Sequence, residues 1–331
     1  MQVPGVTPAL ANSSRPNAAA GRLYNDPTKN DPSDQATLTR TPEEAPPPPD
    51  QLETSARELE ADWANRLGDQ SGKTVVGISV TEAWVKDKFV YLEELAQGVL
   101  AAGGTPRLLF LSRGDAARQM QGLDALIIPG GGDVDPSFYG QVKGPAMADS
   151  NPDKAYDRFQ IDLVQQAYRE KMPLLGLCRG EQVMNVAGGG TLEQSIDAMP
   201  GQHLQHWNDE AFKNRPLRRF GTQEIRILQE SALHRTLGAL AATVNSIHRQ
   251  CVGNLSPQLL VTAWAMDGIP EAVEVKGAPW QLGVQFHPEW LRLDQPQFQN
   301  FFDRLVADGQ RFRAGDLTRP TPPPAVLSTV V

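Results

Sequence analysis

From residue 73 onwards the pattern of apolar and polar positions alternates between two periods. Short apolar runs such as the β-branched 74–80 and the leucine-rich 174–177 are typical of buried parallel strands, whereas 153–171 has apolar residues at helical spacing. We expect strands at 74–80, 107–111, 124–129, 174–177, 261–265, 272–275 and 282–286, and helices at 89–102, 153–171, directly after 177, and at 298–307. This alternation predicts an α/β fold with a mostly parallel central sheet and helices on both faces.

Proline-rich segments lie at both ends of the chain. Residues 1–50 end in a run of four prolines and contain a single aromatic residue, so we expect a disordered arm that buries too little apolar area to order itself. Residues 314–331 are expected to be a flexible proline-rich tail. Residues 51–70 are expected to be a short helix and linker, and 71–313 the folded domain. The proline run is interpreted as a spacer, with a ligand for a proline-binding domain as the alternative.

Composition excludes several classes of protein. The 331 residues carry a net charge of −8, so they lack the basic surplus of most nucleic-acid-binding domains. The two cysteines give no disulfide framework, which is typical of a reducing compartment. The sequence contains no apolar run of the length that spans a membrane and no apolar core of a secretory signal. We therefore expect a cytoplasmic protein that uses neither membrane nor nucleic acid, although Arg15 and Arg22 leave an organellar presequence open.

Cys178 lies between Gly176 and Gly180, directly after a predicted strand and at the start of a helix. This is the cysteine form of a strand–turn–helix elbow, which presents a nucleophile on a sharp turn where a flanking Cβ would collide with the backbone. The amides and the positive dipole end of the helix favour the thiolate, the reactive form. A buried core cysteine is the alternative interpretation, and the second cysteine, Cys251, is expected to be of that kind.

His287 and Glu289 end another predicted strand, two positions apart. In an extended chain, residues i and i+2 face the same side, so both side chains are expected to converge on one point. A carboxylate that orients an imidazole suits a base that takes the proton from Cys178. The alternative is a strand-end histidine beside an unrelated glutamate.

A glycine-rich turn, Gly130-Gly131-Gly132, follows the strand at 124–129. The turn lacks the Gly-Lys-Ser/Thr of a phosphate loop, so its backbone N–H groups are interpreted as donors to an oxyanion, with the Arg179 N–H as a further donor. Asp133 and Asp135 are expected to bind the turn's own amides rather than a metal ion.

Two further groups of residues could carry chemistry. His203 and His206 have a spacing that suits a shared metal ion, but no third ligand is apparent nearby, so they are interpreted as loop histidines. The basic residues of 213–219 are interpreted as a solvated face, with a lid that attracts an anionic substrate as the alternative.

Six motifs occur in one order along residues 73–310. They are PGGGDVDP at 129–136 with YG at 139–140, DRF at 157–159, LGLCRGEQ at 175–182, NVAGGGTL at 185–192, NSIHRQ at 245–250 and GVQFHPE at 283–289. Together they resemble the class I glutamine amidotransferase-like superfamily, and more narrowly its peptidase C26 branch, the γ-glutamyl-γ-aminobutyrate and γ-glutamyl-polyamine hydrolases of polyamine breakdown. The resemblance implies a flavodoxin-like sandwich.

The resemblance also implies roles for individual residues. Cys178, His287 and Glu289 would form the catalytic triad, and the amides of Gly131 or Gly132 and of Arg179 would form the oxyanion hole. Substrate contacts would come from Gln182 and from His248.

Three positions depart from the family pattern: Glu181, Gly188 in place of a leucine, and Arg249 in place of a second histidine. Glu181 stands where the family usually has an apolar residue or histidine. A carboxylate so close to Cys178 would raise the pKa of the thiol and repel an anionic glutamyl group, unless its side chain turns to solvent or pairs with Arg179.

The function expected from these residues is hydrolysis of a γ-glutamyl amide to glutamate and an amine through a cysteine thioester, an attack on a C–N amide bond. The predicted partner is a small γ-glutamyl amine. No cofactor and no metal ion is expected, and a homo-oligomer is left open. Two alternatives remain: a glutaminase subunit that delivers ammonia to a separate synthetase, and a non-catalytic scaffold.

Overall fold

The computed structural model describes residues 49–67, 72–82, 85, 90–207 and 221–316, all within one compact unit, Pro46–Val331. The expected arm at 1–50 lies outside the described residues except for its last two positions. Most of the expected tail at 314–331 and the basic residues of 213–219 also lie outside them.

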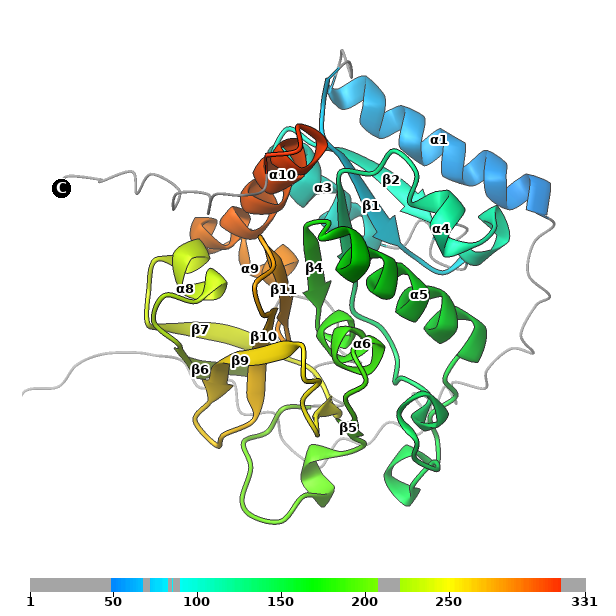
Figure 1. Cartoon of the computed structure of the whole chain (residues 1–331). Helices are drawn as coiled ribbons and strands as arrows, with labels where there is room; N and C mark the ends of the chain where they lie inside the picture. The colour runs from blue at the N-terminus through cyan, green and yellow to red at the C-terminus, as the bar shows by residue number, and fades with distance from the viewer. Residues whose placement is uncertain (1–48, 68–71, 83–84, 86–89, 208–220, 317–331) are drawn as a thin grey trace, which may run out of the picture. The chain divides into compact units, whose positions relative to one another are not determined.

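A nine-stranded sheet forms the centre of the described chain (Figure 1), in the order β2-β1-β3-β4-β11-β10-β9-β6-β7. The first five strands pair in parallel, and the last four extend the sheet with antiparallel pairs. The strands are β1 Val75–Ser79, β2 Thr105–Leu109, β3 Ala125–Ile128, β4 Leu174–Leu177, β6 Gly221–Ile227, β7 Ala241–Ser246, β9 Leu259–Ala265, β10 Pro270–Val275 and β11 Gln281–Val284. A separate small ladder joins β5 Leu192–Glu193 to β8 Cys251–Val252.

Helices cover both faces of the sheet. Helices α3 and α10 pack against each other and against β1, β2 and β3 on one face, while α5 and α6 pack against β3 and β4 on the other. The α-helices are α1 Pro49–Leu67, α3 Val90–Ala101, α4 Ala116–Gln119, α5 Lys154–Glu170, α6 Arg179–Ala187, α8 Ala232–Leu237, α9 Pro288–Leu291 and α10 Asn300–Arg313. The prediction of an α/β fold around a mostly parallel sheet is confirmed.

Each face of the sheet has its own apolar core. Strand β1 and helix α10 contribute Ile78 and Phe302 to the first core, and strand β3 and helix α5 contribute Ile128 and Val164 to the second. The parallel strands therefore bury both faces, which is why their sequences are continuous apolar runs rather than alternating ones. Among the described helices, none has the length and apolar character to cross a membrane.

Capping residues explain where helix α5 begins and ends. The Asp153 side chain accepts hydrogen bonds from the amides of Ala155 and Tyr156 at its start, and Lys171 adopts a left-handed conformation at its end. The predicted helix at 153–171 is therefore found with its caps.

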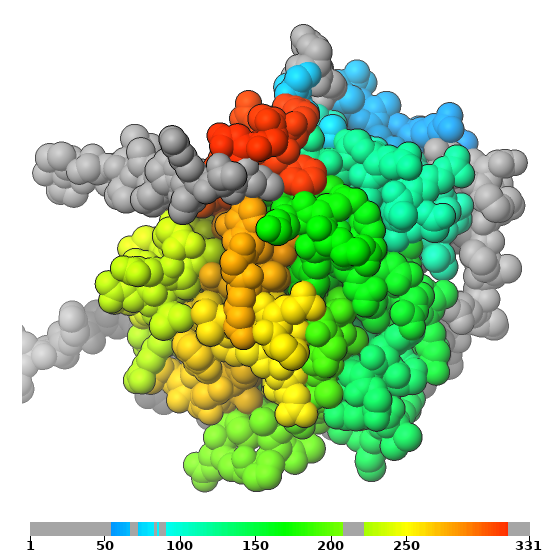
Figure 2. Space-filling view, viewed as in Figure 1, coloured from blue at the N-terminus to red at the C-terminus, as the bar shows by residue number. Residues whose placement is uncertain are grey.

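Two short 3₁₀ segments project from the lower edge in the space-filling view (Figure 2), around η4 Pro145–Met147 and η5 Ile196–Ala198. The first lies in the connection from β3 to α5 and the second in the connection from β5 to β6. Connections of this kind carry binding residues in many α/β proteins, because the sheet holds their ends in place.

Candidate active site

Cys178 occupies a strained elbow between β4 and α6. Its φ angle is 51° and its ψ angle −104°, a conformation that non-glycine residues rarely adopt. The backbone is held there because the Cys178 amide donates to the Val284 carbonyl of β11 at 2.7 Å. The side chain is 5% exposed. The elbow predicted from the two flanking glycines is therefore present.

The imidazole of His287 is held by Glu289. Nδ1 of His287 lies 2.5 Å from Oε1 of Glu289, and both side chains are buried. The expected convergence is found, but the reason given for it is wrong. The chain is not extended after His287: Pro288 starts the short helix α9, and its preset φ angle suits a first helical position.

Burial alone would lower the pKa of His287, but the Glu289 carboxylate and then the Cys178 sulfur outweigh it and raise that pKa to about 10. The ring is therefore protonated at neutral pH.

Three further side chains position His287, and sequence reasoning had assigned them no role. Asn245 accepts from the His287 amide at 2.7 Å and donates to its carbonyl at 3.1 Å. The ring stacks on Trp290 with a centroid distance of 4.1 Å, and Tyr91 meets it edge-on at 5.8 Å. Asn245 is the first residue of one of the six motifs, so that motif could have identified it. Tyr91 lies in none of the six motifs.

The glycine-rich turn lies directly beside the elbow. A Cβ on Gly130 would lie 2.8 Å from Cε1 of His287 and 3.5 Å from Cβ of Cys178. The Gly130 amide donates to the Tyr91 hydroxyl at 2.9 Å. Among the described residues, no acceptor is bonded to the amides of Gly131, Gly132 or Arg179. These amides remain predictions for the oxyanion hole.

The Arg179 side chain links helix α6 to α5 and, through Asp157, to the segment that follows the glycine-rich turn. Its guanidinium is buried and donates to Asp157 and Gln160 of α5, and lies 5.3 Å from the Tyr156 ring centroid. Asp157 also accepts from the Asp135 amide at 2.8 Å, which joins α5 to the glycine-rich turn. Asp135 in turn accepts from the Ser137 amide, as expected of a turn carboxylate.

A chain of amide side chains leads from Cys178 to the predicted substrate contacts. Gln285 donates to Sγ of Cys178 at 3.5 Å, and Gln182 donates to Oε1 of Gln285 at 3.1 Å and to the Gln250 carbonyl at 2.9 Å. His248 faces protein atoms on both ring nitrogens, the Gln250 carbonyl at 3.0 Å and His206 at 3.1 Å. Substrate contact by Gln182 and His248 stays a prediction.

Glu181 neither turns to solvent nor pairs with Arg179, the two arrangements that would have removed its repulsion of an anionic substrate. Its side chain is fully buried, and neither carboxylate oxygen has a hydrogen-bond partner among the described residues. Burial, then Glu271 and Cys178, raise the pKa of Glu181 well above its usual value. The Arg179 guanidinium is bound by Asp157, and among the described residues no lysine or arginine pairs with Glu181. The surroundings of Glu181 therefore favour the neutral carboxylic acid, the form that repels no anionic substrate.

We expect Glu181→Gln to stabilise the protein above neutral pH. Because the folded-state pKa is raised, the protonated Glu181 gives its full stability below the unfolded-state pKa of about 4.3, and that stability is lost as the pH rises towards the folded-state pKa. The loss approaches about 1.4 kcal/mol per pH unit, whereas glutamine has no proton to lose. Urea unfolding at pH 5, 7 and 8.5 measures the difference between the two proteins.

The exposed Glu193 offers the matched control. Glu193→Gln should leave the pH dependence of the free energy of unfolding unchanged. A Glu181→Gln curve parallel to the wild-type curve would contradict the neutral, buried state of Glu181.

Comparisons with known proteins found a family model, several relatives and a solved structure that match this chain. The family model described as peptidase C26 matches residues 74–289, which include Cys178, His287 and Glu289. Protein NtpR of Enterococcus hirae is 30% identical over 234 residues, 70% of this chain and 95% of that protein. The γ-glutamyl-γ-aminobutyrate hydrolase PuuD of Escherichia coli K12 is 31% identical over 205 residues, 60% of this chain and 78% of that protein. A solved structure described as a GMP synthase subunit from Thermoplasma acidophilum covers 73% of this chain and 96% of its own, with 17% identity and a TM-score of 0.47.

Proposed function

The chain belongs to the peptidase C26 family, and from that premise we propose that it hydrolyses a γ-glutamyl amide to glutamate and a free amine. The observation that carries the proposal is the elbow at Cys178, with His287 and its Glu289 partner at its side. Similarity to a γ-glutamyl-γ-aminobutyrate hydrolase supports the same class of substrate. Such an activity would belong to polyamine breakdown.

In the first half-reaction Cys178 is the nucleophile. Its sulfur attacks the γ-carbonyl carbon, and the charge that develops on the carbonyl oxygen is stabilised by the free amides of the glycine-rich turn and of Arg179. His287, protonated at neutral pH, donates its proton to the departing amine as the C–N bond breaks. The products are the amine and a γ-glutamyl thioester on Cys178.

In the second half-reaction water replaces the amine. The Cys178 sulfur is one of the groups that raise the pKa of His287, and acylation converts that sulfur into a neutral thioester. The pKa of His287 then falls, so the ring can take a proton from water while Glu289 holds its orientation. The hydroxide attacks the thioester carbonyl, glutamate leaves, and the Cys178–His287 pair is restored.

A panel of four substrates tests the proposal: glutamine, γ-glutamyl-γ-aminobutyrate, γ-glutamyl-putrescine and γ-glutamyl-spermidine. We expect the chain alone to release glutamate from at least one γ-glutamyl amine about tenfold or more faster than from glutamine, because a site built for the amine loses those contacts with ammonia as the leaving group. Turnover of glutamine alone, and only with an added synthetase, would favour the glutaminase alternative. No turnover of any of the four would favour the scaffold.

A further inference from the structure

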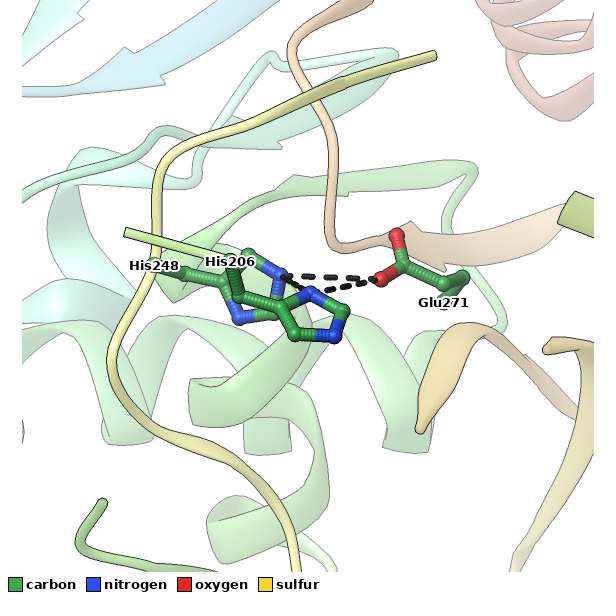
Figure 3. A group of neighbouring side chains, drawn as sticks. All are labelled: His206, His248 and Glu271. Atoms are coloured by element: carbon green, nitrogen blue, oxygen red, sulfur yellow. Dashed lines mark hydrogen bonds and ion pairs between the residues drawn. The ribbon is translucent and has the colours of Figure 1, made fainter. Parts of the chain in front are cut away.

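A second cluster of buried polar side chains consists of His206, His248 and Glu271 (Figure 3). His206 belongs to the loop that follows η5, His248 follows β7, and Glu271 lies on β10 at a shift in its register with β9. All three side chains are at most 2% exposed. The mechanism proposed for Cys178 uses none of them.

Hydrogen bonds on the outer side of each ring fix which nitrogen carries a proton. Nε2 of His206 lies 2.9 Å from Oδ2 of Asp267, and Nδ1 of His248 lies 3.0 Å from the Gln250 carbonyl oxygen. Both partners are acceptors, so each of these nitrogens donates its proton outwards. The two nitrogens that face the centre of the cluster, Nδ1 of His206 and Nε2 of His248, therefore present lone pairs. Histidine metal ligands are held in the same way, with the outer N–H bonded to a carboxylate or carbonyl.

The three inward atoms form a triangle of the size that a tetrahedral metal ion requires. The two nitrogens are 3.1 Å apart, and Oε1 of Glu271 lies 3.6 Å from the His206 nitrogen and 3.5 Å from the His248 nitrogen. Ligands at about 2.0–2.2 Å from a tetrahedral ion are separated by about 3.3–3.5 Å. In Figure 3 both rings turn their nitrogens towards the same carboxylate oxygen. Gln223 orients that carboxylate by donating to Oε1 at 2.5 Å.

The cluster also lacks positive charge. Among the described residues, no lysine or arginine pairs with Glu271, Asp267 or the neighbouring buried Glu181. The second Glu271 oxygen, Oε2, is buried with no hydrogen-bond partner among those residues. Two inward lone pairs and a buried carboxylate repel one another unless a cation lies between them. The Ser246 hydroxyl lies 3.2 Å from both Nδ1 and the carbonyl oxygen of His206. Because its single proton can be donated to the carbonyl oxygen, it does not occupy the lone pair on Nδ1.

We propose that His206, His248 and Glu271 bind one divalent metal ion, with Zn²⁺ preferred for its tetrahedral geometry and its imidazole and carboxylate ligands. Oε2 of Glu271 is available as a further ligand atom. This site replaces the pairing of His206 with His203 considered from the sequence, because His203 directs Nε2 to the Pro200 carbonyl and Nδ1 towards Oδ2 of Asp267, at 3.8 Å, rather than into the cluster. It also revises the expectation that the chain binds no metal.

The ion has a structural role. It joins the loop that carries His206 to β7 and β10, in the antiparallel half of the sheet. The Gln250 carbonyl accepts from both His248 and Gln182, so the ion steadies the amide chain that leads to Cys178. Zn²⁺ should therefore stabilise the fold, since any ion that binds only the folded chain shifts the unfolding equilibrium.

The test uses the untagged full-length chain with Cys178→Ala, because Cys178 and His287 could themselves bind Zn²⁺. The chain has five histidines, so few competing ligands remain. We expect the metal-free protein to bind one equivalent of Zn²⁺ in competition with a chromogenic chelator, and Co²⁺ to give the visible absorption of a tetrahedral site. Adding His248→Ala should weaken Zn²⁺ binding about 100-fold or more, whereas His234→Ala, on helix α8 and outside the cluster, should leave it unchanged.

Asp267→Asn is a second variant in case His248→Ala fails to fold. It keeps all three ligands and the size of the side chain that holds His206 and accepts from the amides of Leu204 and Ile269. It should weaken Zn²⁺ binding about 10–100-fold, and Zn²⁺ should raise its Tm less than that of the parent protein. Absence of a bound equivalent in the Cys178→Ala parent would overturn the proposal, and so would equal binding by a folded His248→Ala variant. Either result would mean that the cluster holds a proton rather than a metal ion. Because the test omits Cys178, its outcome is independent of the proposed hydrolase activity.

Discussion

Replacing Cys178 with alanine is expected to lower kcat for the preferred γ-glutamyl amide about 10⁴-fold or more, to the residual rate that substrate binding and the oxyanion donors supply without a nucleophile. Glutamate release measured over hours with the wild-type chain and the variant gives the ratio. Cys251→Ala is the matched control and should retain activity, because Cys251 lies fully buried in a separate apolar cluster and burial raises the pKa of its thiol to about 12.

Alkylation gives an independent check that needs no substrate. Iodoacetamide at neutral pH should add one group to the wild-type and Cys251→Ala chains and none to the Cys178→Ala chain, as counted by mass spectrometry. A Cys178→Ala variant with wild-type turnover would contradict the assignment of the nucleophile. Alkylation of Cys251 instead of Cys178 would contradict the contrast between the two thiols.

The parallel half of the fold could be predicted from the sequence because its strands are buried on both faces. The runs at 74–80 and 174–177 contain β1 and β4, and the helix predicted at 153–171 is α5. The antiparallel pair β6 and β7 went unrecognised, although β6 alternates between buried Ile225 and Ile227 and exposed neighbours. Two or three alternations in a polar segment are a weak signal, because a surface loop can show them by chance.

The candidate site also contains residues that the sequence predicted and residues that it did not. Cys178, His287 and Glu289 could be proposed from local spacing, because each belongs to a short motif at the end of a strand. Neither the burial of Glu181 nor the cluster around His248 could be predicted, since both depend on which strands are neighbours in the antiparallel half. Spacing along the chain places His203 beside His206, but the fold places His248 and Glu271 there, 42 and 65 positions further along the sequence.

Gly180→Ala is expected to destabilise the protein by about 3–5 kcal/mol, the largest effect on stability that we predict for a single added methyl group. A Cβ at position 180 would lie 2.0 Å from the Ile128 carbonyl oxygen, where α6 crosses β3. That oxygen is main-chain, and β3 is a central strand paired with β1 and β4, so neither partner can move aside. Thermal unfolding should show a decrease in Tm on the order of 10 °C.

Gly132→Ala is the matched control for this effect. Position 132 has no atom within 4 Å of an added Cβ and no left-handed φ angle, so alanine there should leave the Tm unchanged or raise it slightly by restricting the unfolded chain. A Gly180→Ala variant with the Tm of the control would mean that α6 does not approach β3 as closely as described.

The close approach of α6 to β3 also positions the elbow. Helix α6 begins at Arg179, so a helix displaced by the new methyl group would carry Cys178 and the Arg179 amide away from His287 and the glycine-rich turn. Gly180→Ala should therefore lose hydrolase activity even at temperatures where it remains folded, whereas a purely structural role for Gly180 would leave kcat intact in the folded fraction.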